Sequence, residues 1–227
     1  MRGLLYVPII HTEADLGSVG GDIAASGLKE FGETLWRRHE ETVLGFWDAI
    51  AGYFDSIDVS GFKIYQDGMP AGGETAAAIV REALQTGSRN YQVISGLIRK
   101  GAVLVKTEDL SLVEEERDSI LRIMQAKSRA QKLAEALKYK VAKDNLLERR
   151  DKFIAKQIND TLQEGESGIL FIGAFHHVRK WLEKDICVAE LKDVSKVRNY
   201  QELLPFYRRN KERAEKLRKY LTGAVAK

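Results

Sequence analysis

The stretch Gly168-Ile-Leu-Phe-Ile-Gly-Ala-Phe-His-His177 decides the fold class of this chain. It is a short apolar run bounded by Gly165 and Gly173, and a run of this kind is typical of a buried parallel strand. His176 and His177 follow the run at the point where the strand meets the next element. Ligands bind at this carboxyl edge in open α/β sheets, so the stretch predicts both a parallel sheet and a site at its edge.

The beginning of the chain repeats this arrangement. Leu4-Leu-Tyr-Val-Pro-Ile-Ile10 is a second apolar run, and His11, Glu13 and Asp15 follow it. The chain contains only 4 histidines, and most of them lie at the ends of these two predicted strands. We expect His11 and His176 to lie less than about 12 Å apart, because a wider separation would be too large for one shared metal site.

Further apolar runs predict the rest of a mainly parallel central sheet flanked by helices. These runs lie at residues 62–65, 102–105 and 186–191. Segments with apolar residues at helical spacing lie between the runs, at residues 28–54, 74–86, 91–99 and 178–183. Strands that alternate with helices favour an α/β fold, and 227 residues suit one domain, so we predict a single α/β domain over residues 1–227.

A long helical insertion is predicted between the third and fourth strands. Residues 102–164 contain neither glycine nor proline, and apolar residues continue at helical spacing over residues 110–163. A straight helix of some fifty residues would be about 75 Å long, so we expect an antiparallel helical pair. Asp144-Asn145 is the expected break, because both side chains compete with the helix backbone for hydrogen bonds. If the apolar seam of these helices is larger than the core can cover, a second subunit should bury it, so we predict a homodimer through these helices.

The charge of the chain is nearly balanced, with 36 Lys and Arg against 33 Asp and Glu. Basic side chains gather in residues 127–143 and in a predicted basic C-terminal helix at residues 200–221. Acidic residues such as Glu135, Glu212 and Glu215 interleave with them, which favours solvated helix faces. We therefore do not expect nucleic acid to be a partner, although binding through these helices stays an alternative function.

The sequence predicts a cytoplasmic protein with no membrane span. No window of about 18 continuous apolar residues occurs, and the start lacks the pattern of a cleavable signal peptide. Cys187 is the single cysteine, which excludes a disulfide within the chain and a thiolate-rich metal site. Its apolar neighbours Ile186 and Val188 predict that it is buried.

Polar side chains follow the first four predicted strands. They are His11, Glu13 and Asp15, then Asp67, then Glu108 and Asp109, and finally His176 and His177. Imidazoles and carboxylates at one sheet edge can bind a divalent metal ion, for which His11, Glu108 and His176 are the predicted ligands, or supply a general base and its orienting partner. The alternative for Asp67, Glu108 and Asp109 is a role as turn formers and helix caps.

The segment from Leu147-Glu-Arg-Arg-Asp151 to Gly173-Ala-Phe-His176 resembles the closing half of the TraB, erythromycin-esterase and ChaN-like superfamily. In that superfamily, a helix with a Glu-Arg-Asn or Glu-Arg-Asp element precedes a strand that ends in Gly-x-x-His. The matching residues are Glu148, Arg149 or Arg150, Asp151, Gly173 and His176. Pro8-Ile-Ile-His11 matches the histidine of the superfamily's first strand but lacks the glycine.

The resemblance implies an α/β core and, in some branches, metal-dependent peptide hydrolysis or esterase chemistry; other branches bind haem. Together with the strand-end residues it predicts a hydrolase of a small ester, amide or peptide bond, either with a divalent metal ion or without one. Its substrate would be a small molecule or a peptide. The predicted catalytic residues are His11, Glu13, Glu148, Arg150 and His176.

Within this site, Arg150 would pair with a carboxylate or hold an anionic group of the substrate, because its fork of donors suits either partner. The rival function is a binding or regulatory protein that has the same fold without catalysis.

Overall fold

The structure, a computed structural model, describes the whole chain except residues 13, 16–19, 226 and 227. A five-stranded sheet, with all strands parallel, lies at its centre in the order β3-β2-β4-β1-β5. The strands are β1 (Arg2–Ile9), β2 (Lys63–Gln66), β3 (Val103–Val105), β4 (Ser167–Gly173) and β5 (Ile186–Glu190). The predicted α/β fold with a parallel sheet is confirmed.

The central strand β4 is apolar because both of its faces are covered. Side chains alternate along a strand, so Ile169 and Phe171 pack into the core on one face of the sheet, and Leu170 and Ile172 pack into the core on the other. All four side chains are fully buried. A strand that is buried on both faces has no place for a polar residue, which explains the uninterrupted apolar run in the sequence.

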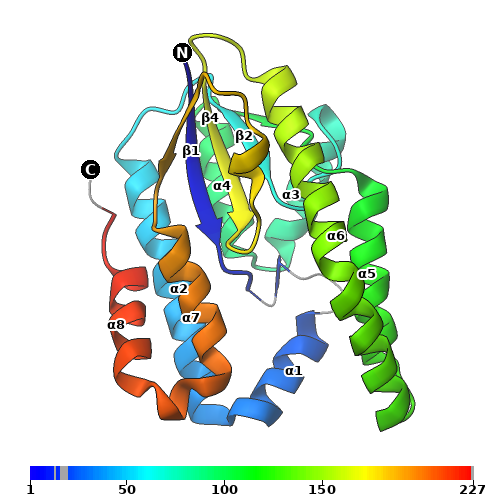
Figure 1. Cartoon of the computed structure of the whole chain (residues 1–227). Helices are drawn as coiled ribbons and strands as arrows, with labels where there is room; N and C mark the ends of the chain where they lie inside the picture. Colours follow the sequence, from blue (N-terminus) through cyan, green and yellow to red (C-terminus); the bar gives the residue numbers. More distant parts are fainter. Residues whose placement is uncertain (13, 16–19, 226–227) are drawn as a thin grey trace.

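Helices cover both faces of this sheet (Figure 1). The helices outside the insertion are α1 (Gly20–Phe31), α2 (Glu33–Asp55), α3 (Gly73–Gln85), α4 (Arg89–Arg99), α7 (Val194–Leu203) and α8 (Lys211–Thr222). The predicted helical segment 28–54 is therefore divided between α1 and α2. Gly32 separates them with a φ of 82°, a conformation that glycine adopts without strain. The helix predicted at 178–183 is a single 3-10 turn, η2 (Val178–Trp181).

The predicted helical pair consists of α5 (Leu110–Met124) and α6 (Arg129–Thr161), which we call the helical arm. Figure 1 shows the two helices side by side, extending past the carboxyl ends of the strands. The break predicted at Asp144-Asn145 is wrong, because both residues are exposed inside α6 and the chain turns at residues 125–128 instead.

The turn of the helical arm has its own sequence signal. The Ser128 hydroxyl accepts a hydrogen bond from the backbone N–H of Gln131 at 3.1 Å. The Gln131 side chain in turn accepts one from the backbone N–H of Lys127 at 3.0 Å. These two bonds satisfy N–H groups that a helix leaves free at its start, so they fix the beginning of α6.

One face of the helical arm carries apolar side chains in contact with water. Leu133, Leu137 and Val141 lie four residues apart on α6, and they are 63%, 54% and 85% exposed. The predicted homodimer would cover such a face, and it stays a prediction.

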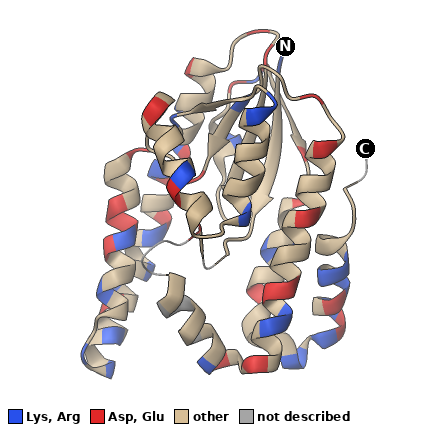
Figure 2. Ribbon diagram, turned by 180° about the vertical axis from the view of Figure 1, so that it is seen from behind, with Lys and Arg blue, Asp and Glu red and all other residues tan. Residues whose placement is uncertain are grey.

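The predicted basic helix at 200–221 is wrong as one continuous element. It is divided among the end of α7, a 3-10 segment η3 (Leu204–Arg209) and α8. Pro205 has no N–H to donate to the preceding turn, so α7 cannot continue through it. Figure 2 shows basic and acidic residues alternating along α8 and the helical arm. Glu215 of α8, for example, pairs with both Arg38 and Arg218.

Among the described helices, none combines the length and the apolar composition that crossing a membrane requires. Cys187 is exposed rather than buried, and it lies on β5, an edge strand with mostly exposed side chains.

Candidate active site

Asp67 is fixed across the carboxyl end of the central strand. Its backbone N–H donates to the carbonyl of Phe171 at 2.9 Å, which extends the pairing of β2 with β4 by one residue. Its carboxylate oxygen Oδ2 accepts a hydrogen bond from the backbone N–H of Gly173 at 3.1 Å. The parallel register of the two strands therefore places this carboxylate at the sheet edge, where ligands bind in such folds.

The two predicted strand-end histidines meet at Asp67. Its Oδ2 lies 3.7 Å from Nε2 of His176 and 4.0 Å from Nε2 of His11. They converge because β1 and β4 are neighbours in the sheet, with Ile9 paired to Gly173. Both separations are longer than a hydrogen bond, so neither Nε2 is committed to the carboxylate.

Asp151 of α6 orients the ring of His176. One oxygen of its carboxylate lies 2.6 Å from Nδ1 of His176, and the other accepts the backbone N–H of His177 at 2.7 Å. Asp151 is 2% exposed and His176 is 6% exposed, so both groups are held inside the protein. With Nδ1 bound to the carboxylate, Nε2 is the nitrogen left to face Asp67 and His11.

The charges around His176 reverse the usual effect of burial. Burial disfavours its protonated form, but the hydrogen bond to Asp151 and the charge of Asp67 outweigh this and raise the pKa of His176 above 6.5. For Asp67, burial acts to raise the pKa, but His176, Arg150 and His11 together lower it below its usual value. The two residues therefore favour each other's charged form.

Arg150 joins three carboxylates from different elements. Its Nη2 donates to Asp67 Oδ1 at 2.7 Å and to Glu108, and its Nη1 donates to Glu116 of α5. Arg150 is 7% exposed and Glu108 is fully buried. The predicted pairing of Arg150 with a site carboxylate is therefore present, and it attaches the helical arm to the sheet. All three of its nitrogens donate to carboxylates of the chain.

Glu108 faces Arg150 rather than the imidazoles. Burial and the charge of Asp67 raise its pKa, while Arg150 acts in the opposite direction, and the pKa of Glu108 lies at about 7. The predicted ligand set of His11, Glu108 and His176 is thus not brought together. Within the part of the chain that the structure describes, no three His, Cys, Asp or Glu side chains are arranged to hold a metal ion.

The other predicted site residues lie elsewhere. Glu148 is exposed on α6 and pairs with Lys152 at 2.6 Å. It lies two residues before Arg150 and so on roughly the opposite side of the helix, which is why it does not reach the sheet edge. Glu13 lies outside the described residues. Asp109 is the N-cap of α5, as the capping alternative predicted.

Asp151 and Asp67 belong to the site but not to the catalytic set predicted from the sequence. Asp151 had a signal, because Arg150, Asp151, Ile154, Ala155 and Ile158 are all buried on the inner face of α6. An ionisable residue on an apolar helical stripe needs a partner, and His176 provides it. Asp67 had a weaker signal, since an aspartate before a glycine is typical of any turn.

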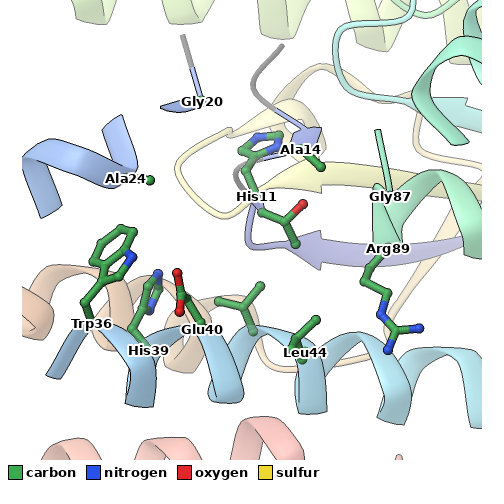
Figure 3. Close-up of a pocket in the computed structure, with 12 residues that line it drawn as sticks. His11, Ala14, Gly20, Ala24, Trp36, His39, Glu40, Leu44, Gly87 and Arg89 are labelled. Carbon is green, nitrogen blue, oxygen red and sulfur yellow. The ribbon is translucent and has the colours of Figure 1, made fainter. Parts of the chain in front are cut away.

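A cavity of about 390 Å³ lies beside the site, and His11 forms part of its wall. Figure 3 shows Trp36, His39, Glu40 and Leu44 rising into it from α2, with His11 and Ala14 opposite. The ring of His39 stacks on Tyr200 and is tilted against Trp36. Burial lowers the pKa of His39 to about 4, so the ring is neutral near neutral pH.

In comparisons with known proteins, no family model, no curated protein and no solved structure matches the chain. A function for this chain is therefore argued from the geometry of the site. The fold and the site define an open parallel α/β domain with a buried carboxylate–histidine pair at the carboxyl edge of its sheet.

Proposed function

We propose that the chain is a hydrolase of a small ester, amide or peptide bond, with His176 as its general base. One observation carries the proposal. The ring of His176 is held by Asp151 through Nδ1 at 2.6 Å, and its Nε2 faces the sheet edge beside His11. A histidine oriented in this way by a buried carboxylate is the usual acid–base unit of hydrolytic sites.

In the proposed reaction, Nε2 of His176 takes a proton from water as the water oxygen attacks the substrate carbonyl carbon. The bond from that carbon to the leaving oxygen or nitrogen then breaks, its electron pair goes to the leaving atom, and His176 returns the proton to it. Asp151 stabilises the positively charged ring between these steps. His11, which is partly exposed at the cavity wall, would donate a hydrogen bond to the substrate.

The test compares two adjacent histidines. Hydrolysis of p-nitrophenyl acetate should fall by about 10²–10⁴-fold in His176→Ala. His177→Ala is the matched control, because His177 is exposed and only its backbone N–H contacts Asp151. Equal rates in wild type and His176→Ala, with a lower melting temperature in the variant, would contradict the proposal and favour the rival binding or regulatory function.

Metal dependence is tested on the same preparations. A general base without a metal ion predicts equal rates before and after treatment with a chelator, and after addition of Zn²⁺ or Mn²⁺. A rate that depends on the ion would instead assign activation of the water to the metal. The carboxylate of such a metal site would be Asp67, not Glu108, because Oδ2 of Asp67 lies 3.7 Å from Nε2 of His176 and 4.0 Å from Nε2 of His11.

A further inference from the structure

The cavity beside His11 has the features of a binding site for an uncharged apolar group. Most of its wall is apolar, with Ala24 of α1 and Trp36, Val43 and Leu44 of α2 among the lining residues. His11 belongs both to this wall and to the charge cluster around Asp67, so a ligand in the cavity would lie directly beside the proposed site. A volume of about 390 Å³ lies at the small end of the range for ligand sites, which suits a ring or a short chain.

The aromatic part of the wall is held in place by its neighbours. Trp36 stacks on Phe31 with ring centroids 6.3 Å apart and contacts the ring of His39 at 5.3 Å. Its ring also packs against Gly27 of α1 so closely that a Cβ there would lie 2.2 Å from the indole. Glycine at this position therefore lets α1 approach α2 and close one side of the cavity.

The charges at the wall disfavour an ionic ligand. His39 is neutral because burial lowers its pKa to about 4. Arg89 bonds Gln92 at 3.1 Å and lies 3.7 Å from Asp48, so its guanidinium is already paired. Glu40 points into the cavity in Figure 3 and would repel an anion. Among the described lining residues, a cation would find one carboxylate, that of the exposed Glu40.

We propose that this cavity binds an uncharged hydrocarbon group of the substrate, either an aromatic ring or a short aliphatic chain. In the hydrolase, this group is attached to the carbonyl carbon beside His11. The preference for such substrates rests on the proposed function, whereas the binding of an apolar ligand does not.

Binding is tested without any reaction, using the neutral dye N-phenyl-1-naphthylamine, whose emission rises in an apolar site. Wild-type protein should bind it saturably with one dye per chain. Ala24→Trp fills the cavity and should weaken binding by about tenfold or more. Ala25→Trp is the matched control, because Ala25 is the next residue of α1 and is exposed. Absence of saturable binding to wild type, or equal affinity in Ala24→Trp and wild type, would overturn the proposal.

The substrate preference is tested with p-nitrophenyl acetate, butanoate and hexanoate. Each CH₂ buried in the cavity should raise kcat/KM by about fourfold, and Ala24→Trp should remove this increase. A rate independent of chain length would overturn the substrate preference. If the dye binds as expected but no ester is hydrolysed, the proposed function fails and the apolar binding site stands.

Discussion

The sheet edge and the cavity beside it share His11 as a common wall, yet they shift the pKa of a buried histidine in opposite directions. At the sheet edge, Asp151 and Asp67 outweigh burial and raise the pKa of His176. In the cavity, His39 has a tyrosine hydroxyl as its polar neighbour, and burial lowers its pKa to about 4. Burial alone disfavours the protonated form of a histidine, and carboxylates beside the ring favour it. One region is therefore suited to proton transfer and the other to an apolar group.

The largest expected effect comes from removing the charge that distinguishes the sheet edge. Asp151→Asn keeps the shape of the side chain but should lower the rate of ester hydrolysis by about 10²–10⁴-fold, because it no longer stabilises protonated His176. Wild-type kcat/KM should rise with pH through an apparent pKa above 6.5, since His176 must lose its proton to act as a base. In Asp151→Asn this pKa should fall.

The pH profile of kcat/KM measures both changes for Asp151→Asn. Asp144→Asn is the control, because Asp144 is exposed on the same helix and should leave the profile unchanged. An unaltered profile in Asp151→Asn would contradict the comparison between the two histidines.

A second large effect is expected on stability rather than on rate. Arg150→Met removes the partner of three carboxylates, whose side chains are 9%, 0% and 24% exposed, and should lower the free energy of unfolding by about 3–5 kcal/mol. The neighbouring Arg149 offers the matched control. It pairs with Glu115 at 3.0 Å but is 48% exposed, so Arg149→Met should cost less than about 1 kcal/mol.

Urea unfolding of the two arginine variants gives both free energies. Equal losses for Arg150→Met and Arg149→Met would mean that the charge cluster does not stabilise the fold, and that the ion pairs of Arg150 only position the site.

The smallest expected effect concerns the pH dependence of stability in the cavity. The folded pKa of His39 is below its ordinary value of 6.5, so the unfolded chain binds the proton more readily. Its contribution to stability is therefore present above pH 6.5 and is lost as the pH falls toward about 4. His176 has the opposite sign, because its raised pKa stabilises the fold at low pH and this contribution is lost as the pH rises through the folded value.

His39→Phe removes the first of these contributions. The variant should lose less stability than wild type between pH 6.5 and pH 4, by on the order of 2 kcal/mol once solvent screening is allowed for. Thermal unfolding across this pH range measures the difference. Parallel curves for the two proteins would show that His39 is not held neutral by its surroundings.

The helical arm shows where local sequence signals are sufficient and where they mislead. The absence of glycine and proline over residues 102–164 predicts long helices, and α5 and α6 fill most of that range. Residue type alone predicts the break at Asp144-Asn145. In the structure both side chains are exposed, so they do not compete with the backbone. The cap formed by Ser128 and Gln131 marks the turn, and it depends on spacing as well as residue type.

The sequence by itself determined the parallel α/β sheet and the position of His11 and His176 at its carboxyl edge. Both follow from hydrophobic runs with histidines at their ends, because parallel strands of one sheet end at the same edge. The two histidines meet because the tertiary structure makes β1 and β4 neighbours. Only the tertiary structure decided which carboxylates join the histidines. Asp67, Glu108 and Asp151 lie on three different elements, far apart in the chain, and the choice between a turn former, an arginine partner and a histidine partner depends on how α6 packs against the sheet. Long-range packing of this kind leaves no periodic pattern in the sequence, so no single stretch could predict the partner of each carboxylate.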